Sequence, residues 1–411
     1  MKRWLIGLVC VAMLLCSGCQ VFFPSPITPE TEEQTPSPYL QEFRDNWCYQ
    51  RLSEPLQDCY AAIYDTVMEK RFADCEVTVS DHATDRTLGA NYRKFPGVRI
   101  NLPHTIENEE DAQALYLAIT WDNPQFFFLS NEYYYEGYRN ADTDGIVCRS
   151  LCLPFTMSAA ERRDMDSRLN KAVGQYLSDL PTGDDFAIEL ALHDRLLQDC
   201  EYHTDAGETH NFDRYPNAFT AVGALVDGKA VCEGYSRGMQ LLLHRAGIAC
   251  SLVTGINENG DPHMWNLVTV NGRNYHLDPT WNDVEGRVRH TFFNLTTDSI
   301  TRTHTIEASV LGVDSCTATE DNYFRRQNHY IDTFERSKIA SIIARDMDAG
   351  ATSIELQFEP PKFINGQLLL GNRQLLMQLI VAQQTAPDAR VWEDYEMLVN
   401  DTYYIILLYK K

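Results

Sequence analysis

The feature that most constrains the fold of this chain is a pair of alternating apolar segments on either side of Asn271-Gly272. Asn-Gly is the strongest two-residue signal for a β-hairpin, because the favoured turn needs positive φ angles at both positions. A two-residue turn pairs Val270 with Arg273, and paired residues lie on the same face of the sheet. His263 and Asp278 are then diagonal neighbours on one face, with Cα atoms about 7 Å apart. We therefore expect the carboxylate of Asp278 to accept a hydrogen bond from the imidazole of His263.

A second segment carries a candidate nucleophile, Cys232. It follows the turn-forming Gly228 and begins a predicted helix that Gly247 ends. Free N–H groups and the helix dipole at such a position favour a thiolate over a thiol, and the same N–H groups can bind an oxyanion. A thiolate, a base and a carboxylate that orients the base are the parts that acyl transfer requires. The sequence therefore predicts a catalytic triad of Cys232, His263 and Asp278; the alternative is that Cys232 is a small structural core residue.

Other residues in these segments compete for the same roles. His276 lies on the second hairpin strand and on the catalytic face, so it is a rival base, although we expect a hydrogen-bonded neighbour or a pocket wall. His244 is about 18 Å along the predicted helix from Cys232 and is expected to be structural. Trp265 faces the catalytic side, where it either lines a substrate channel or packs in the core. Asn266 points to the opposite face, so we do not expect it to orient the base.

Three separated blocks of sequence resemble a known family. Residues 228–236 read Gly-Lys-Ala-Val-Cys-Glu-Gly-Tyr-Ser, residues 263–266 read His-Met-Trp-Asn, and residues 276–281 read His-Leu-Asp-Pro-Thr-Trp. In this order they resemble the transglutaminase-like core that occurs in many bacterial surface proteins. The resemblance covers about residues 185–305 and extends to Phe292-Phe293-Asn294-Leu295, Asp298 and His304.

The resemblance implies a fold and a chemistry. Cys232, His263 and Asp278 match the family's triad one by one, and the implied fold is papain-like, with the cysteine on a helix packed against an antiparallel sheet that bears the other two residues. The family includes acyltransferases, peptidases and amidases, and also members that have lost the triad. The stretch Asp122–Phe127 looks like part of a segment that accompanies this core in other bacterial members, where it has no assigned role.

The first residues resemble the export signal of a bacterial lipoprotein. Two basic residues precede an apolar run from Trp4 to Leu15, which is shorter than the roughly 20 residues that a membrane-spanning helix needs. Small residues then precede Cys19, which the resemblance makes the lipidated residue; Cys16 departs from the usual pattern, and the alternative is a plain secretion signal. Residues 20–39 contain five prolines and are interpreted as an extended tether. We therefore expect a lipoprotein signal in residues 1–19 and an extracytoplasmic protein held at the cell membrane.

The rest of the chain is expected to be an α+β protein, too long for one ordinary core. We expect three units: an α+β N-terminal region of unknown role at 40–180, the transglutaminase-like core at 181–320, and a small α/β domain at 321–411. Within the first unit, Phe126–Leu129 is predicted to be a strand. In the last, Gln367–Gln384 is expected to be one helix and Tyr395–Tyr409 a hairpin.

Composition narrows the range of partners. The formal net charge is −23, from 58 acidic and 35 basic residues, and no basic run is present, so nucleic acid is not an expected partner. Nine cysteines follow Cys19, and an odd number in an exported protein leaves at least one thiol unpaired. Cys148 and Cys152 lack a second pair at zinc-site spacing, and no run of oxygen ligands suits calcium. We therefore expect neither a metal nor an organic cofactor.

Three functions remain compatible with these residues. The first is a cell-surface cysteine peptidase or amidase that acts through a thioester on peptide or protein substrates, cell-wall peptides among them. The second is a transglutaminase, which passes the acyl group to an amine in place of water. The third is a non-enzymatic lipoprotein that uses the core as a binding or scaffold module. The intact triad argues against the third function. The hydrolase is the first hypothesis, and the choice between water and an amine as acceptor stays open, because the sequence does not show how well water is excluded.

Overall fold

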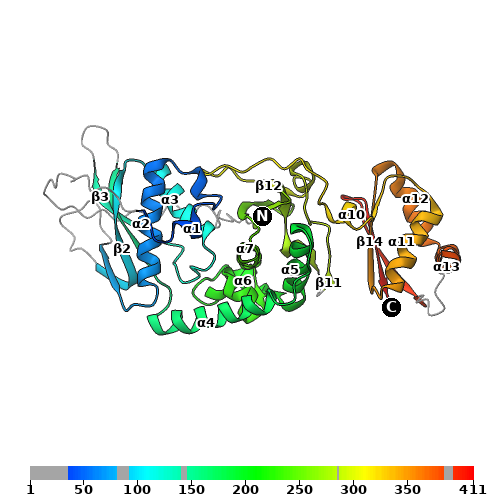
Figure 1. Ribbon diagram of the computed structural model, residues 1–411, viewed down its shortest axis with the longest axis horizontal. Helices are drawn as coiled ribbons and strands as arrows, with labels where there is room; N and C mark the ends of the chain where they lie inside the picture. Colours follow the sequence, from blue (N-terminus) through cyan, green and yellow to red (C-terminus); the bar gives the residue numbers. More distant parts are fainter. Residues whose placement is uncertain (1–35, 81–91, 140–145, 285–286, 384–391) are drawn as a thin grey trace, which may run out of the picture.

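The computed structural model describes residues 36–80, 92–139, 146–284, 287–383 and 392–411. Three four-stranded sheets lie in a row along the long axis of the molecule, with helices packed beside each (Figure 1). The signal peptide predicted at 1–19, the lipidation site Cys19 and the tether as far as residue 35 lie outside the described residues. Within the described ranges, no helix combines the length and the apolar character needed to cross a membrane.

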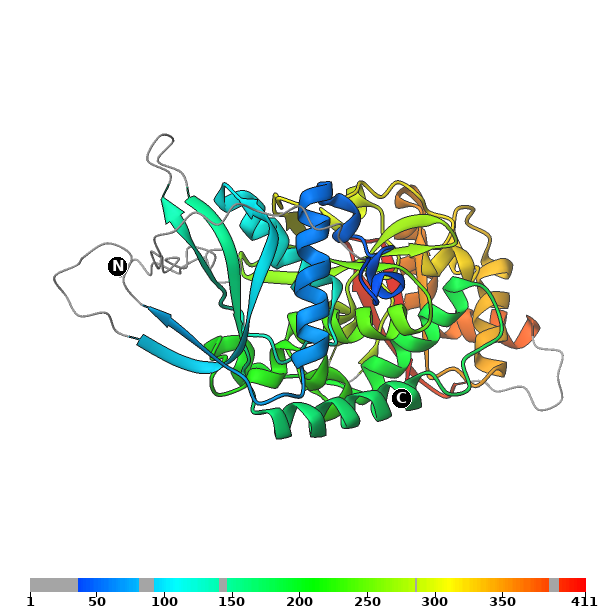
Figure 2. The same cartoon turned by 60° about the vertical axis from the view of Figure 1, so that its left-hand side comes forward.

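The N-terminal unit is an antiparallel sheet with two main helices. The strand order is β1-β2-β4-β3, and α2 packs along β2 with α3 beside it. The elements are α1 (Leu40–Phe43), the 3-10 helix η2 (Tyr49–Arg51), α2 (Glu54–Lys70), β1 (Glu76–Ser80), β2 (Tyr92–Ile106), α3 (Glu109–Asp122), β3 (Tyr134–Arg139) and β4 (Ile146–Pro154). Figure 2 shows α2, the long blue helix, standing at the front of the molecule beside the strands of this sheet.

The aromatic stretch Phe126–Leu129 is not a strand, so that prediction was wrong. It forms turns after α3, and Leu129 makes a single bridge to Phe155. Phe126, Phe127 and Phe128 are each no more than 5% exposed. Aromatic residues favour strands because of how they pack, and here their rings reach the core from a turn instead.

The central unit has the predicted papain-like arrangement. Its antiparallel sheet has the order β12-β7-β8-β9, and the helix that begins at Cys232 packs across β8 and β7. The main elements are α4 (Ala159–Tyr176), α5 (Asp185–Asp199), α7 (Cys232–Arg245), β7 (Cys250–Asn257), β8 (Pro262–Val270), β9 (Arg273–Leu277) and β12 (His304–Ile306). Short connecting elements are β5 (Glu201–Tyr202), α6 (Thr204–Thr209), η3 (Pro216–Phe219), the π-helical η4 (Gly223–Asp227), β6 (Lys229–Ala230), α8 (Pro279–Asn282), β10 (Asp283–Val284), β11 (Arg287–Val288) and α9 (Thr297–Ile300).

The hairpin of β8 and β9 has the predicted register. Val270 pairs with Arg273, and the ladder continues to the pair of Asn266 and Leu277. Asn271 and Gly272 have φ angles of 50° and 76°, as a type I′ turn requires. The turn therefore fixes which side chains of both strands share a face.

Different parts of the chain cover the two faces of the central sheet. On one face, Asn266 Nδ2 donates a hydrogen bond of 2.9 Å to the carbonyl of Ser236 on α7. On the other face, Trp265 joins a buried cluster with Tyr403 and Ile405, which belong to the C-terminal unit. The C-terminal unit thus packs against the face on which the sequence placed the candidate base.

The C-terminal unit is a sheet of order β13-β14-β16-β15 with helices on it. The elements are α10 (Tyr323–Arg326), β13 (Tyr330–Ile331), α11 (Arg336–Asp348), β14 (Ser353–Phe358), α12 (Pro360–Gly371), α13 (Arg373–Gln383), β15 (Tyr395–Asn400) and β16 (Ile405–Lys410). The predicted hairpin is confirmed by the β15–β16 pairing. The prediction of a single helix at Gln367–Gln384 was wrong, because the chain forms two helices that meet at Asn372. The side chain of Asn372 accepts a hydrogen bond from the N–H of Leu375 and starts the second helix.

Two further contacts join the units of the molecule. One cluster of buried apolar side chains runs from Phe43 to Leu311, so the N-terminal and central units share a core. The buried imidazole of His290 joins the central and C-terminal units, because Nε2 lies 3.0 Å from Asp194 on α5 and Nδ1 lies 2.8 Å from Glu355 on β14.

Candidate active site

Cys232 is the first residue of α7 and is partly exposed. Val231 at the N-cap has no side-chain oxygen to bond the first-turn N–H groups, so these groups remain available for a thiolate or an oxyanion. Gly234 lets the preceding loop approach the helix closely, since a side chain there would collide with the carbonyl oxygen of Ala218. The local sequence Cys-Glu-Gly therefore suits an uncapped helix start held tightly against a loop.

His263 and Asp278 form a short, buried hydrogen bond. His263 Nε2 lies 2.7 Å from Asp278 Oδ2. Burial alone disfavours the imidazolium, but the charge of Asp278 and its hydrogen bond to the ring, with a smaller contribution from the neighbouring Cys232, outweigh it and raise the pKa of His263 to about 10. Burial also disfavours the carboxylate, yet the neighbouring histidines hold the pKa of Asp278 well below its usual range. His263 and Asp278 therefore form a buried pair that favours the imidazolium and the carboxylate, and Cys232 lies beside it.

A second imidazole, His304, reaches the same carboxylate. Its Nε2 lies 3.1 Å from Asp278 Oδ2. His304 is on β12, which is joined to the hairpin only through β7. Gly255 on β7 makes room for the rings, since a Cβ there would lie 2.8 Å from Trp265. The family resemblance marked His304, but no local spacing could place it beside Asp278, because the contact depends on the order of the strands.

The competing residues have other roles. His276 Nδ1 accepts a hydrogen bond of 3.1 Å from the indole N–H of Trp265, and burial lowers the pKa of His276 to about 4. His276 is therefore a neutral, hydrogen-bonded neighbour. His244 Nε2 lies 2.7 Å from the carbonyl oxygen of Cys250, which is the structural role expected. Trp265 is fully buried and stacks on His263 with ring centroids 6.0 Å apart.

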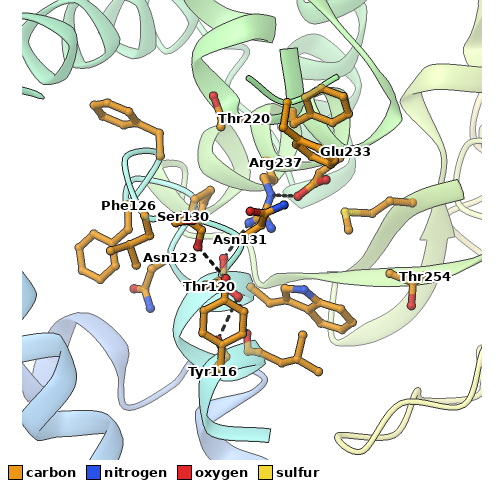
Figure 3. Close-up of a pocket in the computed structure, with 18 of the residues that line it drawn as sticks. Tyr116, Thr120, Asn123, Phe126, Ser130, Asn131, Thr220, Glu233, Arg237 and Thr254 are labelled. Atoms are coloured by element: carbon orange, nitrogen blue, oxygen red, sulfur yellow. Dashed lines mark hydrogen bonds and ion pairs between the residues drawn. The ribbon is translucent and has the colours of Figure 1, made fainter. Parts of the chain in front are cut away.

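Cys232 and His263 line a cavity of about 470 Å³. Figure 3 labels other residues of its lining, among them Tyr116, Phe126 and Arg237. One wall is formed by α7 and the central sheet, and the opposite wall by α3 and the turn 123–131 of the N-terminal unit. Half of the lining side chains are apolar or aromatic: Tyr116, Leu117, Trp121, Pro124, Phe126, Phe127, Leu129, Met157, Phe212, Pro216, Phe219, Met264, Ala308 and Val310. No role was predicted for the N-terminal unit, yet it supplies half of the residues that line this cavity.

Arg237 connects the two walls. Its Nε lies 2.9 Å from Glu233 Oε1, and its Nη1 donates a hydrogen bond of 2.7 Å to the carbonyl of Thr120 on α3 (Figure 3). The end of α3 is in turn fixed by the buried carboxylate of Asp122, which accepts from the N–H groups of Cys48 and Tyr49. Burial raises the pKa of Asp122 to about 6. The helix of Cys232 and the opposite wall are thus held at a defined separation.

The candidate triad region also brings metal-ligand atoms together. Atoms of His263, Asp278 and His304 lie within 4.8 Å of one another. Two ligands of a tetrahedral zinc ion lie about 3.3 Å apart at normal bond lengths. The 2.7 Å between His263 Nε2 and Asp278 Oδ2 is instead typical of a charge-assisted hydrogen bond. These residues fit a hydrogen-bonded network better than a metal.

A second group of this kind is His193, Asp194 and His290. Asn282 Oδ1 accepts from the N–H of Phe292, so its amide nitrogen donates to His193 Nε2. His193 Nδ1 then carries the proton and donates it to Asp194 at 2.8 Å. A protonated nitrogen has no lone pair for a metal, so this group is also a hydrogen-bonded network.

Comparison with known proteins agrees with the central fold. Residues 175–279 match the family model of the transglutaminase-like superfamily, so the chain contains a transglutaminase-like domain. No curated protein matches the chain.

Three solved structures show a partial likeness. A TGase is 13% identical, with a TM-score of 0.27, and the match covers 38% of this chain and 47% of that one. A candidate cysteine protease from Cytophaga hutchinsonii is 13% identical, with a TM-score of 0.22 and coverage of 36% and 61%. A candidate protease from Parabacteroides distasonis is 14% identical, with a TM-score of 0.21 and coverage of 34% and 30%. The chain therefore spans less than two thirds of each of these structures.

Proposed function

We propose that this chain is a cysteine hydrolase that cleaves peptide or amide bonds through a thioester on Cys232. The observation that carries the proposal is the hydrogen bond between Asp278 and His263, with His263 and Cys232 lining the same open cavity. The match of residues 175–279 to the transglutaminase-like superfamily supports the same chemistry.

The proposed reaction has two halves. The Cys232 thiolate attacks the carbonyl carbon, a C–S bond forms, and the N–H groups at the start of α7 bind the oxyanion. His263 gives its proton to the leaving amine as the C–N bond breaks. Water then attacks the thioester, His263 takes a proton from it, and the C–S bond breaks to release the acid and restore the thiolate. Asp278 keeps the imidazole oriented throughout.

The lining of the cavity favours a neutral substrate with large apolar side chains. Apart from His263, which is paired with Asp278, the charged side chains in the lining are Asp213, Glu233 and Arg237, and the last two are paired with each other. Arg237 is further occupied by the carbonyl of Thr120. An acidic wall peptide would find no unpaired basic side chain among these three, whereas an aromatic or aliphatic side chain would bury its surface against the opposite wall. We therefore expect an apolar protein segment as substrate.

The first test is the pH dependence of Cys232 alkylation by iodoacetamide in the purified chain. Mass spectrometry would follow the peptide that contains Cys232, with Cys232→Ala as the blank. We expect an apparent pKa well below the roughly 8.5 of a free thiol, and loss of that shift in His263→Ala. A wild-type Cys232 that reacts like an ordinary thiol would contradict the proposal and favour the scaffold function.

A product analysis separates hydrolysis from transamidation, because both use the same thioester. The chain would be incubated with an apolar peptide and a primary amine. Release of the free acid supports the hydrolase; an amide of the added amine as the main product would make the chain a transglutaminase.

We also propose that a lipid on Cys19 holds the folded part at the outer side of the cell membrane, on the basis of the sequence before and after this residue. In cells fed radioactive palmitate, the wild-type chain is expected to carry label and Cys19→Ser to carry none. Equal labelling of both chains would overturn the anchor.

A further inference from the structure

A line of buried hydrogen bonds leads from the C-terminal unit to the candidate triad. The hydroxyl of Tyr403 lies 2.8 Å from Thr303 Oγ1, which lies 2.9 Å from His304 Nδ1. His304 Nε2 is bonded in turn to Asp278. Tyr403, Thr303 and His304 are each no more than 7% exposed, so these bonds do not compete with bulk water.

We propose that Tyr403 is a positioning residue for the active site, acting through Thr303 and His304 on the carboxylate of Asp278. The proposal rests on the proposed function, because it concerns the same triad. It also gives the C-terminal unit a role in catalysis, although none of the side chains that the structure describes in that unit lines the cavity.

The donors and acceptors along this line are mutually consistent. Asp278 is ionised and can only accept, so His304 Nε2 carries a proton and donates it. With the ring proton of His304 on Nε2, Nδ1 accepts from the hydroxyl of Thr303. Thr303 Oγ1 then accepts from the hydroxyl of Tyr403 at 2.8 Å, and the same hydroxyl also reaches the carbonyl oxygen of Ser299 at 3.2 Å. Each group thereby fixes the orientation of the next. The ring of His304 is held so that its N–H points at Asp278 and not elsewhere.

Tyr403 is itself firmly placed. Its backbone N–H donates to Asn400 Oδ1 at 3.1 Å in the turn between β15 and β16. Its ring packs edge-on against Phe292 with centroids 5.1 Å apart, and Phe292 also contacts His304 at 5.6 Å. The phenol hydroxyl is therefore presented to Thr303 by a rigid hairpin. Removing the hydroxyl alone leaves this packing intact.

The test compares Tyr403→Phe with Tyr395→Phe. Each removes one buried tyrosine hydroxyl from the same unit, but that of Tyr395 bonds the carbonyl of Leu370, away from the triad. In Tyr403→Phe the carboxylate should stabilise the imidazolium less well, so the apparent pKa of Cys232 alkylation should rise. The alkylation rate at pH 6 should fall about 2- to 12-fold, the effect of one hydrogen bond. Tyr395→Phe should behave as wild type.

A second pair of variants tests the same line without touching the C-terminal unit. Thr303→Val should reproduce the shift, and Thr303→Ser, which keeps the hydroxyl, should restore the wild-type profile. If Tyr403→Phe or Thr303→Val folds and keeps the wild-type pH profile, the positioning role is overturned and the proposed hydrolase stands. If the wild-type profile is that of an ordinary thiol, both proposals are overturned.

Discussion

Asp278 accepts hydrogen bonds on both of its carboxylate oxygens. Oδ2 faces His263 and His304, and Oδ1 accepts from the N–H of Trp281 at 3.1 Å as the N-cap of α8. A carboxylate with three donors stays ionised although it is fully buried. At the scale of single residues, this charge is what keeps His263 protonated.

The first prediction concerns that charge. Asp278→Ala should lower the pKa of His263 from about 10 towards the usual 6.5, because the main stabilising charge is lost while burial remains. Turnover of an apolar peptide should fall by about 10²- to 10⁴-fold, the range for a mistuned general base. Asp298→Ala is the control, since this exposed carboxylate belongs to the family-like block but should leave turnover unchanged. Equal turnover in wild type and Asp278→Ala would remove Asp278 from the triad.

At the scale of elements, the β8–β9 turn shows how a local signal places a site. The register followed from Asn271-Gly272 and alternation alone, and it brought His263 and Asp278 together as predicted. His304 and Arg237 contact the site through strand order and helix packing between distant segments, which alternation cannot encode. The prediction of a strand at Phe126–Leu129 was wrong for a related reason. Its apolar residues belong to a turn of the N-terminal unit and are buried from there.

The second prediction tests this turn. Gly272 has a φ of 76° with open space around it, so Gly272→Ala meets backbone strain but no clash. The free energy of unfolding should fall by about 1–2 kcal/mol. Gly174→Ala in α4, which also has open space, should raise it by about 0.5–1 kcal/mol, because alanine favours a helix. Denaturant melts would measure both, and a loss of stability in both variants would refute the backbone explanation.

The third prediction concerns the cavity wall that the N-terminal unit supplies. Met157 is partly buried and lines the cavity, so Met157→Lys should place a cation near bound substrate. The variant should cleave a neutral apolar peptide more slowly than the wild type does. The ratio of the cleavage rate of the same peptide with one Glu to that of the neutral peptide should be higher in the variant. Met165→Lys is the matched control, because Met165 is also partly buried but lies on α4 outside the lining. If Met157→Lys prefers the neutral peptide over the Glu-containing peptide as strongly as the wild type does, this wall does not contact the substrate.

At the scale of the whole molecule, His290 connects two units by its charge. Burial opposes that charge, but bonds to Asp194 and Glu355 outweigh it and raise the pKa of His290 to about 9. The ring also stacks on Tyr323 with centroids 3.8 Å apart. Since the folded pKa exceeds the unfolded value of about 6.5, this stabilisation is complete below pH 6.5 and is lost as the pH rises through about 9.

The fourth prediction follows from the loss of this stabilisation at high pH. Glu355→Gln should destabilise the chain by about 1–3 kcal/mol at pH 6, where the histidine is charged, and by much less near pH 10. Glu359→Gln should have little effect at either pH, because this residue makes only a partly exposed contact with Lys362. Thermal melts across this range would measure the difference. A destabilisation by Glu355→Gln that does not change with pH would show that packing, not charge, joins the units.

The position of Tyr403 has a consequence for how the protein is made. It follows Thr303 by 100 residues, and about 5–20 s pass while a ribosome adds that length. During that interval a nascent chain already contains its nucleophile, base and carboxylate, but lacks the hydroxyl that fixes His304. The growing chain would therefore have a less reactive Cys232 than the finished protein. The cysteine would reach full reactivity only when the β15–β16 hairpin packs against the central sheet.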